Sequence, residues 1–102
     1  MIIYNVTVSV DESIKTDWLN WMKTEHIPEV MAAAVFTKAQ INRVIAQGDS
    51  NNTFAIAYTC ESMKDLHQYQ VNFATELQQK HVARYGDKAV AFRTIMEVIE
   101  EF

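Results

Sequence analysis

Hydrophobic and polar residues alternate over the first ten positions of the chain. Ile2, Tyr4, Val6, Val8 and Val10 occupy alternate positions, and mostly polar residues lie between them. A period of two is typical of a β-strand that buries one face. We therefore predict a first strand that ends at Val10.

The next segment changes to the period of a helix. Ile14, Trp18, Trp21 and Met22 recur on one helical face, and Asp11 or Ser13 is placed to cap its start. Pro28 disfavours helical geometry at the residue before it but suits a first helical turn. The pattern predicts a helix that ends near Thr24, a corner at His26, and a short second helix over 28–34 at an angle to the first.

Alternation returns in the middle of the chain. Residues 36–46 mix β-branched and polar side chains, which indicates an edge strand with one wet face, and residues 53–60 alternate again. Between them, residues 47–52 contain Gly48, Asp49 and two asparagines, a typical turn composition. This segment predicts a β-hairpin.

A second long helical pattern follows the hairpin. Ser62 can cap its start and Gly86 stands where a helix often ends, so we predict a helix over 63–85. The residues expected on its buried face are Met63, Leu66, Phe73, Ala74, Leu77 and His81. Val90, Phe92, Met96 and Val98 then indicate a last strand.

The predicted order is β-α-β-β-α-β. Short connections and right-handed crossovers favour a single α+β domain over residues 1–102: a ferredoxin-like fold with a four-stranded antiparallel sheet and two helices on one face. The uncovered face is expected to carry Ile3, Asn5, Thr7, Ser9, Ala55, Ala57, Arg93, Ile95 and Ile99. Because this set is apolar in patches, we expect a homodimer formed through the sheet face.

Four segments carry a family resemblance: residues 1–8, 18–30, 58–62 and 84–93. Together they resemble a family of short bacterial proteins of unknown function, over nearly the whole chain. The resemblance implies a dimeric α+β barrel, and it implies no substrate or catalytic residue.

Composition narrows the possible partners. The chain has 102 residues with 13 acidic and 9 basic side chains, and the resulting net charge of -4 disfavours nucleic acid. No apolar run is long enough for a membrane span and no signal-peptide pattern is present, so a cytoplasmic protein is expected. Cys60 is the one cysteine, which suits a reducing compartment and a buried apolar role.

The candidate site is the group Trp18, Trp21, Met22, His26 and His81. A pocket between the first helix and the sheet could hold a flat ligand between the tryptophans, with His26 as the proton donor or acceptor. At the end of a helix, the helix dipole would favour protonated His26. The competing interpretation is that both tryptophans are core residues and His26 caps the helix.

Other chemistry finds little support. Asn5 with His81 or His67 is a weaker candidate pair, and the three histidines lack the spacing of a metal site. The chain has only two glycines, Gly48 and Gly86, and no phosphate loop or dinucleotide fingerprint, so no cofactor is expected. An RNA-binding sheet is disfavoured because Tyr4 is in phase with the core residues of its strand.

Two functions remain open at this point. One is a homodimer that binds a small apolar or aromatic molecule, with or without cofactor-independent catalysis. The other is a non-catalytic module for protein interaction or metabolite sensing.

Overall fold

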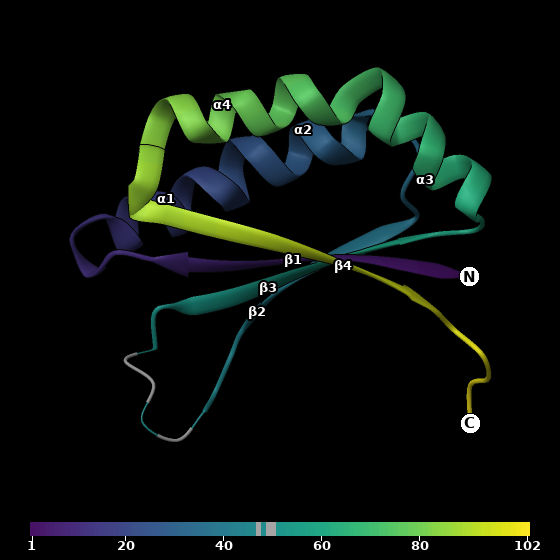
Figure 1. Ribbon diagram of the computed structural model, residues 1–102, viewed down its shortest axis with the longest axis horizontal. Helices are drawn as coiled ribbons and strands as arrows, with labels where there is room; N and C mark the ends of the chain where they lie inside the picture. The colour runs from purple at the N-terminus through teal and green to yellow at the C-terminus, as the bar shows by residue number, and fades with distance from the viewer. Residues whose placement is uncertain (47, 49–50) are drawn as a thin grey trace.

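Four antiparallel strands form one sheet in the order β2-β3-β1-β4. The computed structural model describes residues 1–46, 48 and 51–102. The strands are β1 (Ile2–Val10), β2 (Lys38–Arg43), β3 (Thr53–Cys60) and β4 (Ala89–Glu97). Helices cover one face of this sheet and leave the other uncovered (Figure 1). The predicted ferredoxin-like fold is confirmed.

The central strand follows its sequence pattern. Ile2, Tyr4, Val8 and Val10 are buried on the helix-covered face, and Val6 is half-buried among them. Since β1 is hydrogen-bonded on both sides, to β3 and to β4, its inward side chains lie at the centre of the core.

The first helical segment is continuous, which corrects the predicted corner. Helix α1 (Lys15–Trp21) leads through a π-helical turn (Met22–His26) directly into α2 (Ile27–Ala32). The backbone is helical at His26, with φ of -70° and ψ of -52°. The wider turn before Pro28 supplies room for a residue that cannot donate a hydrogen bond and whose ring would crowd the preceding turn. His26 is therefore inside a helix and not at its C-terminal end.

The second helical segment also contains a π-helical turn. Helix α3 (Met63–Tyr69) passes through the π turn Gln70–Ala74 into α4 (Thr75–Tyr85). Its predicted ends are confirmed: the hydroxyl of Ser62 accepts from the backbone N–H of Asp65 at 3.2 Å, and Gly86 ends the helix with φ of +58°.

The π turn changes which side of this helix is buried. The predicted face included Met63 and Phe73, but these are 49% and 39% exposed, and Tyr69 and Ala74 are buried instead. A π turn adds one residue to the helical repeat, so the buried position after Tyr69 comes five residues later.

The hairpin is confirmed, with a shorter first strand. β2 pairs with β3 from Lys38 opposite Thr59 to Arg43 opposite Phe54, and it forms one edge of the sheet as predicted. Gln47, Asp49 and Ser50 of the predicted turn lie outside the described residues.

The side chains of the last strand point to the opposite faces of the sheet from those predicted. Arg93 is paired with Val6 and Ile95 with Tyr4, and side chains directly opposite each other share a face of the sheet. Arg93 and Ile95 therefore belong to the helix-covered face. Phe92, paired with Thr7, lies on the uncovered face and is 64% exposed.

Two further observations concern individual residues and helix length. Cys60 is fully buried, as expected, and burial raises the pKa of its thiol. Within the described ranges, no helix has the length and apolar character needed to cross a membrane.

Candidate functional site

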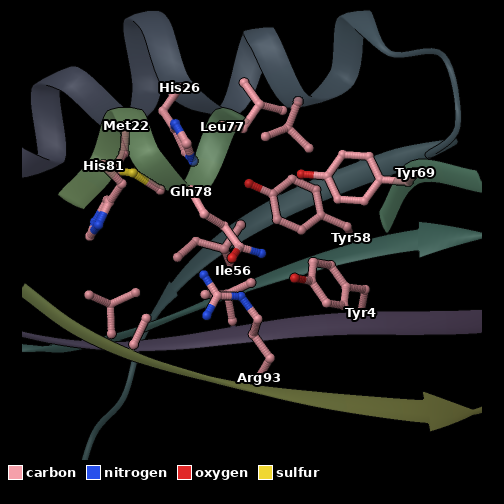
Figure 2. Close-up of a pocket in the computed structure, with 14 residues that line it drawn as sticks. Tyr4, Met22, His26, Ile56, Tyr58, Tyr69, Leu77, Gln78, His81 and Arg93 are labelled. Atoms are coloured by element: carbon pink, nitrogen blue, oxygen red, sulfur yellow. The ribbon is translucent and has the colours of Figure 1, made fainter. Parts of the chain in front are cut away.

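A cavity lies between the helices and the covered face of the sheet (Figure 2). Its volume is about 460 Å³ when the open mouth is included. The interior is narrow, and the centres of water molecules can occupy about 40 Å³ of it. The walls come from both helical segments and from strands β1, β3 and β4. They are formed by Tyr4, Val6, Val8, Met22, His26, Val30, Ile56, Tyr58, Tyr69, Leu77, Gln78, His81, Ala91 and Arg93.

The π turn places His26 over the cavity, where its imidazole points from the helix toward the sheet (Figure 2). Trp21 stacks on this imidazole, with ring centroids 4.8 Å apart and an interplanar angle of 24°. The Nδ1 atom of His26 is enclosed and has no hydrogen-bond partner among the described residues. Because most buried polar atoms are paired, this nitrogen marks an unusual position.

His26 is neutral at physiological pH. Burial, and then the nearby His81, lower its pKa to about 4 against a smaller opposing effect of Glu29. This reverses the predicted effect of the helix dipole, since His26 is not at a helix end. A neutral imidazole can accept a hydrogen bond at one nitrogen and donate one at the other without carrying charge into the cavity.

His81 enters the cavity from α4 and is held by Trp18. The indole Nε1 of Trp18 donates a 2.9 Å hydrogen bond to Nε2 of His81, across 63 positions of sequence. Since an indole N–H can only donate, Nε2 must be the unprotonated nitrogen, and we assign the proton of neutral His81 to Nδ1. Burial, and then the charge of Arg93, lower the pKa of His81.

Three tyrosines line the other end of the cavity. The hydroxyls of Tyr4, Tyr58 and Tyr69 point into it (Figure 2). Their rings hold one another in place, with centroids 6.2 Å apart for Tyr4 and Tyr58 and 6.1 Å for Tyr4 and Tyr69. Burial raises the pKa of Tyr58 and of Tyr69, so both hydroxyls keep their protons and can donate.

Arg93 and Gln78 complete the polar lining. The side chain of Arg93 points from β4 and that of Gln78 from α4 toward the interior of the cavity (Figure 2). Arg93 is an exposed residue, so we place it at the mouth of the cavity.

The structure brings three of the five predicted site residues to the cavity: Met22, His26 and His81. Trp18 and Trp21 contact the two histidines but are not among the residues that line the cavity. Both are buried core residues, as the competing interpretation expects, and they also position the imidazoles.

The alternative pair of Asn5 with a histidine is not assembled. Asn5 pairs with Ala57 on the uncovered face and donates to Thr7 Oγ1 at 3.1 Å, while His67 is exposed on α3. The helices and Asn5 are therefore on opposite sides of the sheet.

Sequence reasoning missed the tyrosines, Gln78 and Arg93 as site residues. Arg93 was assigned to the other face because Phe92 and Val90 are apolar. The small residues Ala89 and Ala91, which fit beneath packed helices, were the available signal for the correct phase.

The fold and the cavity make this chain a small ferredoxin-like protein with a pocket between its helices and its sheet. Residues 1–99 match the family model described as a domain of unknown function, DUF4286. The chain belongs to this family. A comparison with curated proteins gives no match.

Several solved structures share the fold at low sequence identity. A dimeric ferredoxin-like protein from an uncultured marine organism has a TM-score of 0.76 and 10% identity, covering 99% of this chain and 96% of its own. An ethyl tert-butyl ether family protein from Bacillus halodurans has a TM-score of 0.74 and 13% identity, covering 97% and 100%. A candidate antibiotic biosynthesis monooxygenase from Nitrosomonas europaea has a TM-score of 0.70 and 14% identity, covering 98% and 100%. These likenesses establish the fold.

Proposed function

We propose that the cavity binds a small molecule with an apolar or aromatic body, at the site formed by Met22, His26 and His81. The observation that carries this proposal is the convergence of two neutral imidazoles and three tyrosine hydroxyls in a cavity whose other lining residues, apart from Gln78 and Arg93, are apolar. Mostly apolar walls with a few placed polar groups are the usual composition of ligand pockets. A bound molecule would contact the aliphatic walls with its body and the polar groups with its oxygen atoms.

The small enclosed volume limits the ligand. The 40 Å³ that water centres can occupy is room for a few waters, whereas the 460 Å³ figure includes the mouth. A one-ring molecule therefore requires Gln78 or Arg93 to move at the mouth, and we expect compact ligands to be favoured over polycyclic ones.

Catalysis without a cofactor is the stronger form of this proposal. His26 would act as a general base that takes a proton from the bound molecule and later returns it, since its imidazole points into the cavity and is neutral at pH 7. The fold-level likeness to a candidate monooxygenase is an analogy that supports a small-molecule ligand and identifies no reaction.

Binding can be tested by isothermal titration calorimetry with phenol, catechol and 1,4-benzoquinone as compact one-ring probes. We expect at least one probe to bind the wild-type protein at millimolar or better affinity, and the His26→Ala variant to lose that affinity. His67→Ala is the matched control because His67 is exposed on α3, away from the cavity. Equal binding by wild type and His26→Ala would show that this cavity is not the binding site.

We also propose that the protein is a homodimer through the uncovered face of the sheet. Phe92 and Val90 are 64% and 61% exposed there, and Met96 lies farther along the same side of β4. Large exposed apolar patches commonly mark interfaces. The similar proteins from marine organisms are described as dimeric, which supports this assembly.

Light scattering after size-exclusion chromatography tests the dimer. We expect the wild-type chain at micromolar concentration to have twice the monomer mass, and Phe92→Glu to be a folded monomer. If the wild type is a monomer, the uncovered face instead fits the alternative of a surface for another protein.

A further inference from the structure

Every polar side chain of the cavity lining can donate a hydrogen bond, and one of them, Arg93, is positively charged. We infer that the ligand is an oxyanion, a compact aromatic or unsaturated molecule with one carboxylate or ionised hydroxyl, whose negative oxygen faces Arg93 and the tyrosine hydroxyls. This inference rests on the proposed function, and it specifies the charge of the molecule that the same cavity binds.

Arg93 supplies the positive charge. Within residues 1–46, 48 and 51–102, the side-chain ion pairs involve Lys15, Lys80 and Arg84, and none involves Arg93. Glu29, a carboxylate close to His26, is already bound to Lys80, with 2.7 Å between Lys80 Nζ and Glu29 Oε2. The guanidinium at the cavity mouth is thus available to an anion, for which its planar set of donors is well suited.

The lining offers no competing negative charge. It contains no aspartate or glutamate among the described residues, and its uncharged polar groups are tyrosines, histidines and one glutamine. A cationic ligand would meet only Arg93 as a charged partner and would be repelled by it. A neutral ligand would gain no charge attraction from the guanidinium.

The two imidazoles add to this donor character. The bond from Trp18 leaves the proton of His81 on Nδ1, so the nitrogen of His81 that can accept is already used. For His26, the enclosed and unpartnered Nδ1 is best left as a bare acceptor, because buried N–H groups without a partner are rarer than buried acceptors. Its proton is then on Nε2, and this N–H can donate a hydrogen bond to an oxygen atom in the cavity.

The apolar walls specify the rest of the ligand. Val6, Val8, Ile56 and Ala91 form the floor on the sheet, and Met22, Val30 and Leu77 lie on the helical side. These side chains offer contact area without hydrogen bonds, so they favour a hydrocarbon ring over a sugar or a phosphate.

Benzoate and benzamide are a suitable pair of probes because they have nearly the same shape and differ in charge. We expect wild-type protein at pH 7 to bind benzoate at least about tenfold more tightly than benzamide in calorimetric titrations. Phenol at pH 7 and 4-nitrophenol at pH 8.5, where the latter is ionised, extend the comparison to the ionised hydroxyl.

Arg93→Met should abolish the preference for benzoate, bringing the two affinities to within about threefold of each other. Arg43→Met is the matched control: Arg43 is on a strand of the same sheet, but its guanidinium lies over the Phe54 ring and outside the cavity. The control should keep the wild-type preference. An independent check uses the wild-type protein alone, in which the Arg93 Nε–H NMR resonance should shift on addition of benzoate and not of benzamide.

Each result has a definite meaning. Equal affinity for benzoate and benzamide, or a preference that survives Arg93→Met, would overturn the inference and leave the proposed ligand-binding function intact. Absence of binding by both probes in wild type would overturn the inference, and absence of binding by all the neutral probes as well would overturn the proposed function. If the Arg93 resonance of the wild-type protein does not shift at saturating benzoate, the inference is overturned. This result does not depend on whether the Arg93→Met variant folds.

Discussion

Replacement of Trp18 by phenylalanine tests whether the indole N–H sets the protonation state of His81. The indole is fully buried and donates to His81 Nε2 at 2.9 Å. A donor to the unprotonated nitrogen stabilises the neutral imidazole, so removing the donor should raise the pKa of His81 toward its ordinary value. Phenylalanine keeps an aromatic ring in the core and removes the N–H.

The expected cost in stability has two parts of similar size. Losing the hydrogen bond costs about 1 kcal/mol. The smaller ring leaves a void of roughly 40 Å³, which at about 24 cal/mol per Å³ costs about 1 kcal/mol more. We therefore expect Trp18→Phe to lower the free energy of unfolding by about 2 kcal/mol.

Two measurements are required, since a loss of packing alone would also lower stability. Urea unfolding gives the free energy, and an NMR titration of the imidazole resonances gives the pKa of each histidine. His67, which is exposed on α3, is the internal control. If Trp18→Phe loses the expected stability but the pKa of His81 does not change, the proposed role of the indole N–H is refuted.

Two other perturbations have defined outcomes. His26 has a pKa of about 4 in the folded protein, against 6.5 for an unperturbed histidine. As the pH is lowered, the unfolded chain therefore takes up a proton before the folded protein does, and the free energy of unfolding decreases as the pH falls from about 6.5 to about 4. Allowing for partial solvent contact, His26 should account for about 1 to 2 kcal/mol of the loss between pH 7 and pH 5. In urea unfolding at the two pH values, His26→Gln should lose less stability on acidification than wild type, by that amount. The neighbouring titratable and charged groups, His81, Glu29, Lys80 and Arg93, are the same in both proteins. An identical pH dependence of the two proteins would contradict the assignment. Gly86→Ala should cost about 1 to 2 kcal/mol, because φ is +58° and no atom lies within 4 Å of an added Cβ, so the cost is one of backbone conformation alone; a loss below about 0.3 kcal/mol in the same assay would contradict it.

Much of the fold follows from local pattern. The alternation through Tyr4 and Val8 correctly assigns β1 and its buried face, and Ser62 and Gly86 correctly bound the second helical segment. These features depend on residues close in sequence, and the packing of the folded chain agrees with them.

The incorrect predictions occur where a proline interrupts a helical pattern and where a strand carries apolar residues on the uncovered face of the sheet. Pro28 normally indicates a helix boundary, but a π turn accommodates it, and that turn also directs His26 into the cavity. In β4, Phe92 is apolar because it lies on the uncovered face, so hydrophobicity alone gives the wrong phase and places Arg93 on the wrong side.

The candidate site is only partly visible in the sequence for a related reason. His26 and Met22 are near each other along the chain, and their proximity to the tryptophans is predictable. Trp18 and His81 are 63 residues apart in sequence, and their contact joins α1 to α4. The three tyrosines come from β1, β3 and α3. Such convergence depends on sheet register and helix rotation, which the spacing of residues does not reveal.

The most direct test of the central claim is an NMR titration of ¹⁵N-histidine-labelled protein with benzoate. We expect the imidazole resonances of His26 and His81 to shift together with one saturable affinity, and those of exposed His67 to remain unchanged. Saturable binding that shifts neither His26 nor His81, or no binding at millimolar benzoate, would contradict the claim that this cavity is a binding site for compact aromatic oxyanions.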